Sequence, residues 1–79
     1  MITTLERVKE GMSAVVRQVY GGHRLRQRLS GLGIHVDDRL KVLRTGFLGG
    51  PVLIEIHGTE VGIGHGMAEK IEVEVMEEE

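Results

Sequence analysis

The chain has 79 residues and no cysteine, so it is long enough for one small domain and holds no disulfide or thiolate metal site. Its net charge of −2 is unevenly divided: residues 1–48 carry nine Lys/Arg against four Asp/Glu (+5), and residues 49–79 carry one Lys against eight Glu (−7). Because no apolar run reaches the roughly 20 residues of a membrane span and no secretory signal follows the start, we expect a soluble, cytoplasmic protein.

The first regular elements predicted along the chain are a strand over Ser13–Tyr20, which is rich in β-branched residues, and a helix over His23–Leu32. After the glycine pair at 21–22, apolar residues no longer recur at every second position, as in a strand, but about every 3.6 residues, as in a helix. Gly33 stands where a helix commonly ends in a left-handed residue. The leucines at i, i+4 and i+7 are predicted to pack the helix against the core: Leu25, Leu29 and Leu32.

A third segment, Arg39–Thr45, alternates as a strand, and a glycine-rich loop leads to the hairpin of residues 52–65. A two-residue turn at Gly58–Thr59 would place Ile56 opposite Val61 and His57 opposite Glu60. This register matches apolar residues with apolar partners on one face of the hairpin. A slip by one residue would expose them to water.

The chain closes with a helical turn over Gly66–Lys70 and an alternating strand over Ile71–Val75. Together these patterns predict a mostly-β protein, a small barrel of about five strands with one short α-helix after the first strand. We expect one domain over residues 1–75, followed by an acidic C-terminal tail at 76–79.

Residues 21–34 read Gly-Gly-His-Arg-Leu-Arg-Gln-Arg-Leu-Ser-Gly-Leu-Gly-Ile, which resembles the FeoA family signature of a glycine turn, an Arg/Leu-rich helix and a Leu-Gly-Ile exit. Three further stretches resemble the family pattern: Leu5 with Gly11, Pro51–Ile56, and Ala68 with Ile71 and Val73. The chain departs from the family pattern in three places. Residues 36–38 stand where the family usually has Pro-Gly, and residues 49–51 lack the usual Asp before the proline. Gly64 stands where a basic residue is typical.

The resemblance implies an SH3-like barrel and a cytosolic accessory of the FeoB ferrous-iron transporter, a membrane protein with a GTPase domain. Contact with the membrane would then be indirect, through the transporter. Arginine is common at interfaces because its planar fork binds carboxylates. The predicted partner-binding residues are Arg24, Gln27, Arg28, Phe47 and Leu48. A homodimer, for instance through the Ile71–Val75 strand, is a further expectation.

A metal site is predicted only weakly. The assumed hairpin register places Glu55, His57 and Glu60 on one exposed face, where carboxylates and an imidazole can take up Fe²⁺ or Zn²⁺. The alternative is an ordinary polar strand face, and no HxxxH or HExxH spacing is present. We expect no required cofactor.

Three other functions are possible for a small barrel of this size. A metal-responsive sensor module would be similar to the SH3-like C-terminal domain of iron-dependent repressors. A nucleic-acid-binding barrel is disfavoured, because Tyr20 and Phe47 are the only aromatic residues and the net charge is negative. An enzyme is not expected, since neither Ser13 nor Ser30 has a nucleophile setting recognisable from sequence.

Overall fold

The computed structural model describes residues 1–76, apart from the side chain of Phe47. Its elements in chain order are β1 (Ile2–Thr4), the 3-10 turn η1 (Leu5–Arg7), β2 (Ser13–Val19), α1 (His23–Gly31), β3 (Arg39–Arg44), η2 (Phe47–Gly49), β4 (Val52–Ile56), β5 (Thr59–Ile63), α2 (His65–Ala68) and β6 (Ile71–Met76). No helix within the described residues is long and apolar enough to span a membrane.

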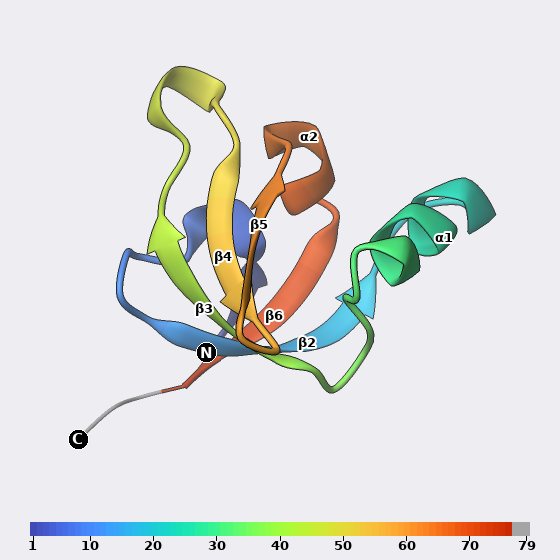
Figure 1. Ribbon diagram of the computed structural model, residues 1–79, viewed down its shortest axis with the longest axis horizontal. Helices are drawn as coiled ribbons and strands as arrows, with labels where there is room; N and C mark the ends of the chain where they lie inside the picture. The colour runs from blue at the N-terminus through green and yellow to red at the C-terminus, as the bar shows by residue number, and fades with distance from the viewer. Residues whose placement is uncertain (77–79) are drawn as a thin grey trace.

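The described strands form one antiparallel sheet in the order β1-β6-β2-β3-β4-β5, which curls around a small core (Figure 1). The predicted mostly-β fold is therefore confirmed, with six strands instead of about five. The additional strand, β1, is only three residues long and pairs with β6 alone. Because β1 and β2 cover the two sides of β6, the expectation that this strand offers a dimer edge is wrong; the free edges belong to β1 and β5.

The core consists of aliphatic side chains from every strand of the sheet except β1, from α1, α2 and η1, and from two loop residues, Val8 and Ile34. Alternation along the strands decides which residues enter it: Ile54 and Ile56 are buried, whereas Glu55 between them is exposed. The last strand, β6, extends to Met76, so it includes the first residue of the expected tail. The remainder of that tail, residues 77–79, lies outside the described residues.

The hairpin of β4 and β5 has a different register from the predicted one. Its two-residue turn is His57–Gly58, with φ of 52° and 76°, which is the type with positive φ at both central positions. Ile54 consequently opposes Val61, and Glu55 opposes Glu60. The error is a slip of two residues, which preserves the buried and exposed faces and is therefore not excluded by hydrophobic alternation.

Helix α1 extends away from the sheet beyond the end of β2 (Figure 1). Leu29 is buried and Leu25 is half-buried, but Leu32 is 37% exposed. The prediction that Leu32 packs the helix against the core is therefore wrong. Gly33 has φ of 83° and Ile34 N–H donates to the Leu29 carbonyl at 2.9 Å. This is the glycine-terminated helix end predicted from the sequence, and it returns the chain to the core at Ile34.

Candidate functional site

The predicted partner-binding residues of α1 are exposed: Arg24, Gln27 and Arg28 all face solvent. Neither arginine makes an ion pair with a described residue. The first turn of α1 contains no acidic residue but carries Arg24 at its second position. Since a helix N-terminus is the positive end of the helix dipole, a cation there disfavours the helix. Folding therefore does not explain the charge of Arg24.

Arg26 is a third arginine of α1, and the sequence prediction did not include it. At about 100° per residue it lies roughly 200° around the helix from Arg24, on the flank that carries Ser30. That flank borders a cleft of about 420 Å³ between α1 and β2. The i, i+3, i+4 spacing of Arg26, Leu29 and Ser30 was the available signal, because such residues share one helix face.

The cleft has a mostly apolar surface. Its walls are formed by Val19 of β2, Leu29 of α1, and Ile34 and Val36 of the loop that follows α1. Of these, Val36 is 53% exposed, whereas the other three are almost fully buried. The polar lining includes Arg17, Arg26, Ser30 and His35.

Arg17 owes its position to a β-bulge in β2. Val16 opposes Val73 and Gln18 opposes Glu72, so Arg17 is the extra residue between them. A bulge redirects the side chains that follow it. Arg17 and Gln18 are consequently both exposed, and Val19 returns to the core.

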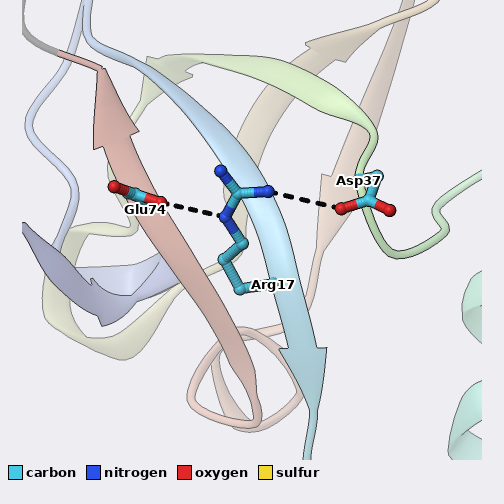
Figure 2. Close-up of polar contacts among 3 residues, drawn as sticks. All are labelled: Arg17, Asp37 and Glu74. Carbon is cyan, nitrogen blue, oxygen red and sulfur yellow. Dashed lines mark hydrogen bonds and ion pairs between the residues drawn. The ribbon is translucent and has the colours of Figure 1, made fainter.

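Figure 2 shows the Arg17 guanidinium between two carboxylates on different elements. Its Nη1 lies 3.3 Å from Oδ1 of Asp37, and its Nε lies 3.0 Å from Oε1 of Glu74 in β6. Backbone hydrogen bonds hold the same loop, because Asp37 N–H donates to the Val16 carbonyl at 2.7 Å and Val16 N–H donates to the Asp38 carbonyl at 2.9 Å. The loop that forms one wall of the cleft is thus attached to β2 beside the bulge.

Asp38 collects hydrogen bonds from two histidines on different elements. The His35 backbone N–H donates to its Oδ2 at 2.8 Å, and Nε2 of His57, in the β4–β5 turn, lies 3.3 Å from its Oδ1. Burial by itself raises the pKa of Asp38. The hydrogen bond from the His35 backbone, together with the side-chain hydrogen bonds of His57 and His35 and the charge of His57, outweighs burial and holds that pKa below its ordinary value.

A chain of side chains continues from Asp38 to Ser30. Nδ1 of His35 lies 3.4 Å from Oδ2 of Asp38, and its Nε2 is hydrogen bonded to the Ser30 hydroxyl at 3.0 Å. These atoms follow the order of a Ser–His–Asp triad. Ser30, however, lies in the last turn of α1, where carbonyl oxygens and the negative dipole end oppose an oxyanion. We therefore interpret the network as a structural connection between α1, the loop that follows it and the β4–β5 hairpin, and not as a site of acyl transfer.

The predicted metal ligands are not brought together as a set. Glu55 and Glu60 are cross-strand neighbours, but His57 lies in the turn and contacts Asp38 instead. Among residues 1–76, no group of three or more His, Asp or Glu side chains is placed to hold a metal ion. Metal binding by these residues stays a prediction.

The glycine-flanked loop contains the two remaining predicted contact residues. Leu48 is 90% exposed and has a left-handed backbone with φ of 52°. The side chain of Phe47 lies outside what the structure describes. The loop between β3 and β4 lies apart from α1 (Figure 1), so Leu48 is a separate exposed apolar residue.

The curled antiparallel sheet with a short helix after β2 defines the class: a small SH3-like β protein. The chain belongs to the FeoA domain family, whose model matches residues 3–75. A protein of Methanocaldococcus jannaschii provisionally named Fe(2+) transport protein A is 41% identical over 66 residues, covering 84% of this chain and 78% of that protein. The crystal structure of an iron uptake regulatory protein, FeoA, superposes with a TM-score of 0.86 at 29% identity, covering 96% and 99% of the two chains.

The same fold occurs within a larger regulator. A manganese-dependent transcriptional repressor superposes with a TM-score of 0.87 at 22% identity, over 95% of this chain and 42% of the repressor. At that identity the likeness shows the fold alone. The predicted SH3-like fold and family resemblance are confirmed, and the fold is shared with a metal-dependent repressor.

Proposed function

We propose that this protein is a cytoplasmic, non-enzymatic accessory of ferrous iron transport that docks through α1 on the cytosolic part of a FeoB-type transporter. Membership of the FeoA family and the name of the M. jannaschii relative support the iron-transport role. The arginines of α1 that make no ion pair with a described residue support this docking face, because Arg24 is placed against the helix dipole and is not explained by folding.

Titration of the purified cytosolic domain of the transporter into this protein tests the proposal. Docking through exposed arginines predicts saturable binding that weakens as salt is raised, because exposed charges are screened over about 8–10 Å at physiological ionic strength. Absence of binding at high micromolar concentration, in low salt, would contradict it. A homodimer through the β1 or β5 edge remains a separate prediction, which sedimentation of the protein alone tests.

A metal-responsive sensor is the second candidate, because the same fold occurs within a manganese-dependent repressor. Calorimetry with Fe²⁺, Mn²⁺ and Zn²⁺ separates the two functions. Stoichiometric binding at low micromolar concentration favours the sensor, whereas weak or absent binding together with transporter binding favours the accessory role. A salt-sensitive shift with single-stranded oligonucleotides would be required for the nucleic-acid alternative.

A further inference from the structure

The cleft between α1 and β2 combines two chemistries at one place. Its walls are apolar, and Val36 presents an exposed apolar side chain at the opening. At about 420 Å³ the cleft is large enough for one or two large side chains, and it lies near the low end of the range for small-molecule pockets. When a partner's side chain covers apolar surface of this kind and removes it from water, the complex is stabilised.

The two arginines of the cleft differ in how their charge is used. Arg17 already has two carboxylate partners, Asp37 and Glu74. Arg26 is exposed and makes no ion pair with any residue of the described chain. Within residues 1–76, Arg26 is therefore the one arginine of the cleft without a carboxylate partner, and it is on the α1 side.

The surrounding charges also determine where an anion can sit. Asp37 and Asp38 lie on the loop side of the cleft, and the carbonyl end of α1 lies near Ser30. Both features repel a carboxylate. Only the Arg26 side attracts one, so an incoming segment must present its carboxylate there and its apolar side chain toward Ile34 and Val36.

We infer that this cleft receives a short segment of the docking partner that carries a large apolar side chain next to an Asp or Glu. The inference rests on the proposed function and adds a second contact, on the flank of α1 opposite Arg24 and Arg28. The carboxylate pairs with Arg26, and the apolar side chain covers Val36. Arg17, held by Asp37 and Glu74, positions the loop wall and is not the anion receptor.

The test uses the full chain and three single substitutions at exposed positions. Arg26→Glu reverses the charge at the anion position, Val36→Asp places a carboxylate on the apolar wall, and Arg44→Glu is the matched control on β3. Each is titrated with the cytosolic domain of the transporter, after circular dichroism has shown native folding. We expect Arg26→Glu and Val36→Asp to weaken binding about tenfold or more, and Arg44→Glu to change it less than about twofold.

The outcomes separate the two proposals. If the wild-type protein does not bind the domain, the proposed function fails. If the wild-type protein binds the domain and neither Arg26→Glu nor Val36→Asp weakens binding more than the control Arg44→Glu does, docking is real but the cleft inference is overturned. If sedimentation shows that the wild-type protein self-associates and Arg26→Glu makes it monomeric, a second copy is the occupant and the inference is likewise overturned.

Discussion

Arg17 and Asp37 face each other across 3.3 Å, and Asp37 does so from a left-handed backbone with φ of 75°. The two features differ in their energetic weight. Exposed ion pairs contribute about 0–1 kcal/mol, whereas the left-handed conformation costs most side chains roughly 1–2 kcal/mol and is tolerated by Asp, Asn and Gly. Backbone conformation should therefore decide which residues position 37 accepts.

Asp37→Ala is expected to lower the free energy of unfolding by about 1–2 kcal/mol, because alanine tolerates the left-handed region poorly. Asp37→Asn should lie within about 0.5 kcal/mol of wild type, although it removes the charge as well. Urea denaturation measures both, with Arg17→Gln as the control that removes the ion pairs to Asp37 and Glu74 and leaves residue 37 unchanged. Equal losses in Asp37→Ala and Asp37→Asn would show that the ion pair dominates.

The two glycines at the end of α1 should respond in opposite directions to the same substitution. Gly31 is helical, and a Cβ there would meet no neighbour within 4 Å, so Gly31→Ala should stabilise the protein by about 0.5–1 kcal/mol. Gly33 is equally open but has φ of 83°, so Gly33→Ala should destabilise it by roughly 1 kcal/mol. Thermal unfolding of the pair checks the prediction, and a shift of the same sign in both would contradict it.

The lowered pKa of Asp38 predicts that the folded protein loses stability at acidic pH. Its folded-state pKa lies below its value in an unfolded chain, about 3.9, so its ionised form contributes stability above that pH. The contribution is lost as the pH falls through the folded-state pKa. Asp38→Asn, which can still accept the His35 N–H, should lose less stability between about pH 6 and pH 3 than wild type does. Parallel stability curves for the two proteins would exclude this role.

The observed hairpin register places two like charges opposite each other, Glu55 and Glu60. Directly opposed like charges destabilise a strand pair by a few tenths to about 1 kcal/mol. Glu60→Lys should therefore raise the free energy of unfolding by about that amount, and Glu60→Gln should raise it less. The gain should fall at high salt. A loss of stability in Glu60→Lys would contradict the pairing with Glu55.

Much of the fold follows from local patterns. Alternation over Ile54 and Ile56 correctly predicts the buried face of β4, and Gly33 correctly marks the end of α1. Alternation does not fix register, since a slip of two residues leaves the same face buried. The turn at His57–Gly58 was missed for that reason: a glycine signals positive φ, but not whether it stands first or second in the turn.

The candidate site was harder to predict, because long-range pairing creates it. Gln18 is exposed beside Arg17 only because the register of β2 against β6 shifts between Val16 and Gln18, and no local pattern announces the shift. Asp38 and His57 are far apart in sequence and meet only once the sheet forms. Arg24 and Arg28, in contrast, were correctly placed on the exposed surface, since helical periodicity alone determines that.

Arg24→Glu tests the central claim most directly, because the two roles of position 24 predict opposite effects. An acidic residue in the first turn of α1 should raise the free energy of unfolding by about 0.3–1 kcal/mol through the helix dipole. If α1 docks on the transporter, the same substitution should weaken binding of the cytosolic domain at least about tenfold, or 1.4 kcal/mol. A more stable protein with weaker binding is the predicted result, and a stable Arg24→Glu protein that binds with wild-type affinity would contradict docking through α1.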